Sequence, residues 1–388
     1  MEMSEFDRPL YVSRIADELP EYRKHFQSII SEILDSMVGN DNDISELRPR
    51  LDQLFDYFYV QHPRLKYGIR FILSYRILTD KQHSGQQQQQ QLESGAGNDG
   101  NTQQSIVVSN ESVYALAVAV ELITMSLILL DDIMDKATLR YGIPSWYTLP
   151  SVGMSALNDS TVMLTMSDKI VNQYYHGHPN YIQIVQCIQE FIEKISMGQS
   201  LDMMYSLSTK QNKNLKLTDF NMAIFDKLNK YKNAFSVYVY QFKLAIILAD
   251  KQQYDNKFVE TIENFLIDMG ILSGALNDYQ DYYEQGIDIQ EGKCTWLICR
   301  SMQLADNRQL AQLVDNYGHE NADRVQQICR IFDELDMKSE VRKFADNMFN
   351  KYQQLAANDY GNDLLVKQIV DNISYEVRYY AKICHIYE

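Results

Sequence analysis

The sequence predicts an all-α protein, and three observations support this prediction. Only seven prolines occur in 388 residues. Almost every segment spaces its apolar residues three and four apart, with Lys, Glu and Gln between them, which is the period of an amphipathic helix. Asn-Gly turns between alternating apolar runs, which would indicate β-hairpins, are absent from the sequence.

The composition indicates a globular protein with a sizeable core, because 45% of the residues are hydrophobic and 23% are charged. The formal net charge of -16 disfavours nucleic acid as a partner, since phosphate backbones are bound by clustered Lys and Arg. An acidic protein can still bind an anionic substrate when metal ions bridge the two.

Three features of the sequence bear on location. The five cysteines form no CxxC pair, so neither a zinc site nor a disulfide framework is indicated. Residues 1–7 are acidic and lack the apolar stretch of a signal peptide. The longest apolar stretch, residues 122–130, is far shorter than the roughly 20 residues of a membrane span. We therefore expect a cytoplasmic protein without a membrane span.

One segment interrupts the helical pattern. Residues 82–105 contain an uninterrupted glutamine run at 86–91, followed by a stretch rich in Gly, Ser and Asn. Such a composition buries too little apolar surface to order itself, so we expect a mobile loop between two helices. The loop could mark a domain boundary, but the roughly 80 residues before it would form a small domain without a disulfide or a metal. We expect a single helical domain over residues 1–388.

An apolar helix that ends in three carboxylates is the most informative stretch. Asp131 and Asp135 are four residues apart and share one helical face, and Asp132 lies one position round. Carboxylates so close together repel one another unless a cation lies among them, and oxygen ligands suit Mg²⁺. The alternative is a solvated acidic helix end, although Asp is poorly placed at the negative end of the helix dipole.

Four motifs resemble those of farnesyl diphosphate synthases and related trans-prenyl diphosphate synthases. They are residues 131–135 with their continuation to Trp146-Tyr147, and residues 198–202, 231–235 and 288–296. The resemblance covers most of the chain. It implies a class I terpenoid synthase-type helical bundle around a deep central cavity, an allylic prenyl diphosphate substrate and a homodimer. It also implies Mg²⁺ as the metal, with three ions bound and Mn²⁺ able to substitute.

The second acidic motif departs from the family pattern. The family has two adjacent Asp residues and a third further on, whereas this chain reads Asn277, Asp278 and Asp281. An Asn side chain keeps a carbonyl oxygen that can bind metal, and Asn277 lies one helical turn before Asp281. The arrangement is similar to the second metal motif of terpene cyclases, although Glu284 stands one residue earlier than that motif places it. Coincidental drift is the alternative explanation.

By the same resemblance, four residues bind the diphosphate of the allylic substrate. They are Arg140, Lys232, Lys293 and Gln199. The three cations would neutralise charge on the leaving pyrophosphate as the C–O bond breaks.

The resemblance also locates the site for the co-substrate, isopentenyl diphosphate, and this site departs from the pattern most. Its expected cationic and polar positions fall on His62-Pro63-Arg64, Tyr67, Thr124 and Tyr141. Losing two charge-assisted contacts of roughly 1.5 to 3 kcal/mol each weakens binding by about two to four orders of magnitude. Lys66 or Arg70 could restore the site.

These departures favour a terpene synthase that ionises farnesyl or geranylgeranyl diphosphate and cyclises the carbocation, most like the insect-type terpene synthases derived from this family. Ser126 and Leu127 replace the bulky aromatic residues that cap the family's cavity, which indicates a deeper pocket. The alternative is a working prenyl diphosphate synthase that condenses the allylic substrate with isopentenyl diphosphate. A third hypothesis, a non-catalytic partner subunit, does not explain the acidic motifs.

Overall fold

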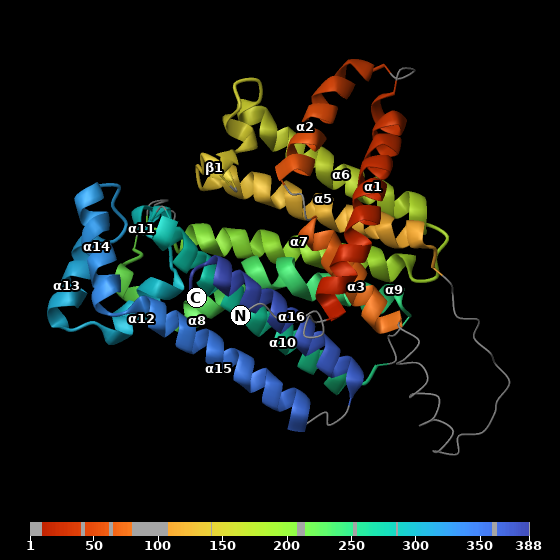
Figure 1. Cartoon of the computed structure of the whole chain (residues 1–388). Coiled ribbons are helices and arrows are strands. Elements are labelled where there is room, and N and C mark those ends of the chain that lie inside the picture. The colour runs from red at the N-terminus through yellow and green to blue at the C-terminus, as the bar shows by residue number, and fades with distance from the viewer. Residues whose placement is uncertain are drawn as a thin grey trace. The chain divides into compact units, whose positions relative to one another are not determined.

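The structure is a computed structural model that describes residues 10–39, 43–61, 65–79, 108–140, 142–207, 214–250, 254–284, 286–358 and 363–387. Within these ranges the protein is helical apart from turns and one two-stranded antiparallel hairpin (Figure 1). The all-α prediction is therefore confirmed. The Gln-rich segment at 82–105 lies outside the described residues.

The chain divides into two compact units. Met1–Glu190 and Tyr240–Tyr254 form the first unit, and Phe191–Val239 and Asp255–Glu388 form the second. The expectation of a single domain over residues 1–388 stays a prediction.

The first unit is built around the helix that carries the first acidic motif. Its elements are α1 (Leu10–Val38), η2 (Ser45–Leu47), α2 (Arg48–Gln61), α3 (Lys66–Thr79), α5 (Asn110–Met134), β1 (Leu139–Arg140), β2 (Ile143–Pro144), η3 (Trp146–Thr148), η4 (Gly153–Ser155), α6 (Ala156–Tyr175), the first part of α7 (Tyr181–Met204) and α9 (Tyr240–Leu248). Helix α5 packs against α1, α3 and α6, and every residue from Val113 to Ser126 is buried.

Helix α5 is long and apolar enough to cross a membrane by length and composition alone. However, 83% of its most apolar window is buried inside the protein, as expected of a central core helix.

The second unit is built around α10. Its elements are the rest of α7, η5 (Leu217–Asp219), α8 (Met222–Asn229), the π-helix η6 (Lys230–Val239), α10 (Asn256–Glu284), α11 (Ile287–Glu291), α12 (Trp296–Leu304), α13 (Asn307–Asn316), α14 (Ala322–Glu334), α15 (Met337–Asn358) and α16 (Leu364–Ile383). Helix α10 packs against η6, α12, α15 and α16.

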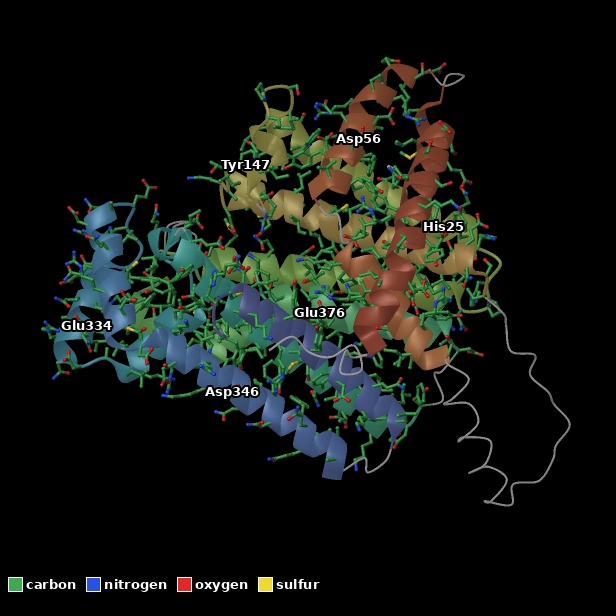
Figure 2. The ribbon with its side chains drawn as sticks, in the orientation of Figure 1. His25, Asp56, Tyr147, Glu334, Asp346 and Glu376 are labelled. Carbon is green, nitrogen blue, oxygen red and sulfur yellow. The ribbon has the colours of Figure 1, made fainter. Side chains whose placement is uncertain are left out.

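The C-terminal residues pack onto the second unit. Ile386 is fully buried, and the Tyr387 hydroxyl donates a 2.6 Å hydrogen bond to Asp346 of α15, which Figure 2 labels. The Arg342 guanidinium lies 5.3 Å from the centre of the Tyr387 ring. These contacts fix the end of the chain to α15.

A fully buried carboxylate joins α5 to α3 in the first unit. Glu121 of α5 accepts hydrogen bonds from the backbone N–H groups of Tyr67, at 3.0 Å, and Gly68, at 2.7 Å, in the first turn of α3. These are two of the donors that a helix N-terminus leaves without an intrahelical partner. Burial raises the pKa of Glu121 to about 7, although the two N–H groups and the charges of Lys66 and Arg70 lower it.

Glycines allow α10 to approach the end of α8 and η6 closely in the second unit. A Cβ atom at Gly270 would lie 2.3 Å from the Cα atom of Ala234, and one at Gly274 would lie 1.8 Å from Oδ1 of Asn229. Because Gly270, Gly274 and Asp278 are spaced by four residues, they share one face of α10. The glycines therefore set the position of the helix that carries the second acidic motif.

We predict that Gly270→Ala destabilises the protein by about 1 to 3 kcal/mol, because the new methyl group would overlap the backbone of Ala234. Urea denaturation gives the change in the free energy of unfolding. Gly177→Ala is the matched control, since nothing lies within 4 Å of a Cβ atom there. Equal effects of the two substitutions would contradict the close approach of α10 to η6.

We also predict that Glu121 makes the stability depend on pH. Its pKa is about 7 when folded and near 4.5 when unfolded, so between these values the folded chain binds more protons. The free energy of unfolding should therefore fall by about 2 to 3 kcal/mol as the pH rises through this window. Glu121→Gln removes the titration but keeps a hydrogen-bond acceptor. Parallel pH profiles of the two proteins in urea denaturation would refute the prediction.

Candidate active site

The first acidic motif lies at the C-terminal end of α5, where the chain turns sharply. Lys136 adopts a left-handed conformation, with φ 52°, and its N–H donates to the carbonyl of Ile133 at 3.3 Å. The N–H of Ala137 donates to the carbonyl of Asp132 at 2.9 Å. This pair of hydrogen bonds is a Schellman motif, and it ends the helix directly after Asp135.

The β1–β2 hairpin returns Arg140 to the motif. Gly142, with φ 82°, permits the tight turn between the two strands. The sequence analysis did not predict this hairpin. The Arg140 guanidinium pairs with Asp132, donating from Nε at 2.7 Å, and with Asp131, donating from Nη2 at 3.2 Å. Burial raises the pKa of Asp132 to about 6, with smaller increases from Asp131 and Asp135, whereas Arg140 lowers it.

A buried charge network anchors the segment that follows the hairpin. The indole Nε1 of Trp146 and the guanidinium of Arg50 both donate to Oδ2 of Asp159, each at 2.7 Å. Arg50 also donates to the carbonyl of Ser151 at 3.0 Å. Residues 146–151 are therefore tied to α2 and α6, which restrains the loop that follows Arg140.

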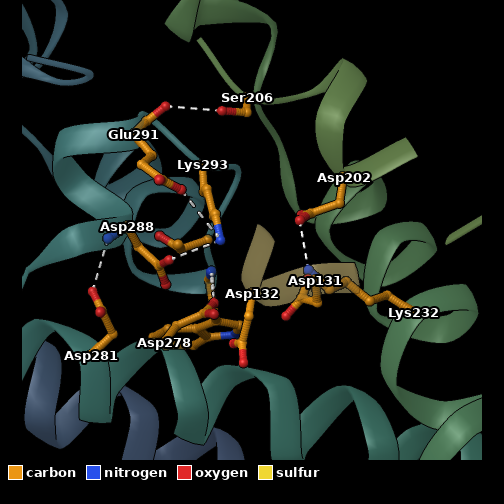
Figure 3. A network of polar contacts seen from close by, with 12 residues as sticks. Asp131, Asp132, Asp202, Ser206, Lys232, Asp278, Asp281, Asp288, Glu291 and Lys293 are labelled. Carbon is orange, nitrogen blue, oxygen red and sulfur yellow. Dashed lines mark hydrogen bonds and ion pairs between the residues drawn. The ribbon is translucent and has the colours of Figure 1, made fainter. Parts of the chain in front are cut away.

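The second acidic motif uses its carboxylates to hold the start of two helices. Oδ2 of Asp278 accepts from the N–H of Trp296 at 2.7 Å, in the first turn of α12. Oδ2 of Asp281 accepts from the N–H of Asp288 at 3.0 Å, in the first turn of α11 (Figure 3). Helix N-termini stabilise negative charge, so both contacts favour ionised carboxylates.

Opposing effects act on the pKa values in this part of the second unit. Burial, followed by the charge of Asp288, raises the pKa of Asp278 well above its usual value and that of Asp281 to about 7. Asp202 adds to the rise at Asp278, and Lys293 lowers the value at Asp281. These carboxylates therefore form a site in which added positive charge would be strongly stabilising.

The two predicted cations of the second unit both pair with carboxylates. Lys232 Nζ donates to Oδ2 of Asp202 at 2.7 Å, and Lys293 Nζ lies 3.5 Å from both Asp288 and Glu291 (Figure 3). A Cβ atom at Gly198 would lie 2.5 Å from the backbone nitrogen of Lys232, so α7 packs directly against the backbone of η6 at Lys232. Sequence reasoning did not single out Asp202, although it lies in the motif at 198–202.

The structure places the remaining predicted residues as follows. Asn277 is exposed, and its amide oxygen accepts from the Tyr380 hydroxyl at 3.2 Å. Gln199 is partly exposed on α7. Ser126 is fully buried, with its Oγ 2.9 Å from Oγ of Ser160 on α6, and Leu127 beside it is partly exposed. The roles assigned to these four residues stay predictions.

Among the described residues, no group of three His, Cys, Asp or Glu side chains converges as a ready-made metal site. This is compatible with Mg²⁺, which is bound through one or two carboxylates together with water and substrate phosphates. Within each unit the carboxylates fit such an ion: Asp132 in the first unit, and Asp278 and Asp281 in the second, are hard oxygen ligands whose ionisation burial disfavours. A divalent cation would reverse that effect.

Residues 79–335, about two thirds of the chain, match the polyprenyl synthetase family. The chain belongs to this family. The resemblance seen in the sequence motifs is thereby confirmed.

The chain is also similar to individual curated proteins that are named geranyl or farnesyl diphosphate synthases. A geranyl diphosphate synthase of Ips pini is 24% identical over 348 residues, covering 86% of this chain and 77% of that protein. Farnesyl pyrophosphate synthase 1 of Cannabis sativa is 26% identical over 348 residues, covering 88% and 92%. A farnesyl diphosphate synthase of T. brucei, solved with risedronate, has a TM-score of 0.73 and 17% identity, covering 92% of this chain and 98% of that one. The last likeness shows a shared fold.

The prediction of a terpene cyclase, most like the insect-type enzymes, is wrong. The relatives are named geranyl and farnesyl diphosphate synthases, so they support the alternative prediction of chain elongation. The cyclase prediction depended on cations missing at Tyr67 and Tyr141, with Arg64 as the one cation retained, and of these three residues only Tyr67 lies within the described residues.

We predict that Lys136→Gly stabilises the protein by about 0.5 to 1 kcal/mol, because glycine adopts the left-handed conformation without the Cβ penalty. Thermal unfolding would show a higher midpoint. Lys136→Ala is the control, since it removes the same charge but keeps a Cβ atom. If alanine stabilises as much as glycine, the gain comes from the charge and not from the backbone.

Proposed function

We propose that this protein is a prenyl diphosphate synthase, which condenses an allylic prenyl diphosphate with isopentenyl diphosphate in a Mg²⁺-dependent reaction. The observation that carries the proposal is the family match over residues 79–335, which includes both acidic motifs and their paired cations. The new C–C bond joins C1 of the allylic substrate to C4 of isopentenyl diphosphate. The allylic C–O bond breaks, pyrophosphate leaves with the bonding electrons, and a proton is lost from the condensed cation.

The carboxylates of both units have a common role in this proposal. Asp131, Asp132 and Asp135 in the first unit, and Asp278 and Asp281 in the second, would hold Mg²⁺. The bound metal supplies electrophilic stabilisation of the leaving pyrophosphate. Buried carboxylates that are costly to ionise alone are suited to this role.

Arg140, Lys232 and Lys293 would bind diphosphate oxygens. In the structure each of these cations is held by a carboxylate: Arg140 by Asp131 and Asp132, Lys232 by Asp202, and Lys293 by Asp288. If the diphosphate of the substrate replaces these carboxylates, every cation keeps an anionic partner. It also gives each cation a strong charge-assisted hydrogen bond to the group whose charge grows as the C–O bond breaks.

Several expectations from the sequence analysis remain part of this proposal. They are the homodimer, the cytoplasmic location, the binding of three Mg²⁺ ions with Mn²⁺ as a substitute, and the effect of Ser126 and Leu127 on product length.

Incubation with geranyl or farnesyl diphosphate, isopentenyl diphosphate and Mg²⁺ should yield a longer diphosphate, detected by mass spectrometry. EDTA should abolish turnover, and Asp131→Ala should lower kcat at least a hundredfold while far-UV circular dichroism stays unchanged. Release of a volatile hydrocarbon from the allylic substrate alone, with no use of isopentenyl diphosphate, would overturn the proposal.

A further inference from the structure

Lys293 lies in a turn whose backbone geometry is set by a Schellman motif. Gly292, with φ 64°, follows the last residue of α11, and the N–H of Lys293 donates to the carbonyl of Asp288 at 3.0 Å. The N–H of Gly292 donates to the carbonyl of Ile289 at 3.2 Å, which completes the motif. The turn determines where the Lys293 side chain begins, and the charge of this side chain acts on Asp281 of the second acidic motif.

A buried tyrosine from the turn between α13 and α14 holds the same backbone. The Tyr317 hydroxyl donates a 2.7 Å hydrogen bond to the carbonyl of Lys293. Burial raises the pKa of Tyr317 well above its usual value, so the hydroxyl keeps its proton and remains a donor. The Thr295 hydroxyl, which caps α12 by accepting from the N–H of Ile298 at 3.3 Å, lies 3.5 Å from the Tyr317 oxygen. The tyrosine therefore meets the chain where the lysine turn leads into α12.

Two glycines bring the tyrosine and the lysine turn together. Gly318, the residue after the tyrosine, has φ 80°, and its N–H donates to the carbonyl of Ile289 at 3.0 Å. A Cβ atom at Gly292 would lie 2.9 Å from the Cα atom of Gly318 and 2.8 Å from Cβ of Leu207. A side chain at Gly292 would therefore push the two turns apart, and its absence lets backbone contact fix the distance between them.

The Lys293 side chain needs such support to bind a substrate. Its Nζ lies 3.5 Å from carboxylate oxygens of both Asp288 and Glu291 (Figure 3). Both distances exceed the roughly 2.7 to 2.9 Å of a strong charge-assisted hydrogen bond, so a diphosphate oxygen would compete well for the ammonium. Lysine is a point charge on a flexible stem, and a misplacement of about 1 Å near the reacting atoms can lower a rate about a hundredfold. The position of the Lys293 backbone therefore matters for catalysis.

We propose that Tyr317 is a positioning residue for Lys293, whose carbonyl it holds so that the ammonium meets the diphosphate of the allylic substrate. This inference rests on the proposed function, in which Lys293 binds that diphosphate. Tyr317 does not touch the substrate and acts only through the Lys293 backbone. The two residues are 24 positions apart, so no local motif joins them.

Steady-state kinetics of the full chain test this role. Tyr317→Phe removes the hydroxyl and keeps the ring, and it should lower kcat/KM for the allylic substrate about three- to tenfold, the effect of losing one hydrogen bond. The KM for isopentenyl diphosphate should change less than about twofold. Tyr352→Phe is the matched control, because it also removes a buried hydroxyl of the second unit, one that donates to Asp268 at 2.6 Å. Equal losses in the two variants would refute the positioning role.

A double-mutant cycle shows whether Tyr317 acts through the lysine. Lys293→Gln alone should lower kcat/KM for the allylic substrate about ten- to a hundredfold, the effect of losing one charge-assisted contact. Tyr317→Phe added to Lys293→Gln should have less than about a twofold further effect, because no ammonium is left to position. If the two losses multiply instead, the tyrosine acts independently of the lysine and the inference fails.

Calorimetry with inorganic pyrophosphate and Mg²⁺ separates this inference from the proposed function. Wild-type protein and Tyr352→Phe should bind pyrophosphate equally, and Tyr317→Phe should bind it about three- to tenfold more weakly. If wild-type protein condenses the substrates but Tyr317→Phe keeps its pyrophosphate affinity and its kcat/KM, the inference fails while the proposed function stands. If wild-type protein does not condense the substrates but Tyr317→Phe alone weakens pyrophosphate binding, the proposed function fails and the positioning role survives.

Discussion

A carboxylate removed from water must meet positive charge or N–H donors, and this constraint explains most of the polar structure of both units. Asp132 meets the Arg140 guanidinium, and Asp202 meets the Lys232 ammonium. A helix N-terminus serves the same purpose for two other carboxylates: Asp278 holds the start of α12, and Glu121 holds the start of α3. The same contacts therefore stabilise the fold and position the groups that we assign to substrate binding.

The fold class and the first acidic motif were predictable because their signals are local. Apolar spacing identifies helices from neighbouring residues, and Asp131, Asp132 and Asp135 lie within one helical turn and a half of one another. The pairing of Arg140 with this motif was not predicted from physical reasoning, because it depends on the left-handed turn at Lys136 and the hairpin at Gly142. Lysine in a left-handed turn gives no sequence signal, whereas glycine there would have done so.

Interactions between distant segments were the main omission. Asp202 and Lys232 lie 30 residues apart, and Glu121 binds backbone groups 53 and 54 residues away. Nothing in a single sequence indicates which buried Glu will accept from which helix N-terminus. The wrong prediction of cyclisation has the same origin, since it compared cations position by position. On α3 the Lys66 ammonium lies 5.4 Å and the Arg70 guanidinium 5.6 Å from the centre of the Tyr67 ring, and a comparison of single positions overlooks such neighbouring cations.

The contacts of the π-helix η6 with its neighbours constrain the number of residues in this segment more strictly than the identity of those residues. Gly198 of α7 lies against Lys232 near one end of η6, and Gly270 of α10 lies against Ala234 two residues later. Removing one residue before Lys232 would rotate the following side chains by roughly a quarter of a turn about the helix axis. The lysine would then turn away from Asp202, and a side chain would face Gly198 where only backbone fits. The fold can tolerate single substitutions in this segment, whereas an insertion or deletion would disrupt the contacts with α7 and α10 together.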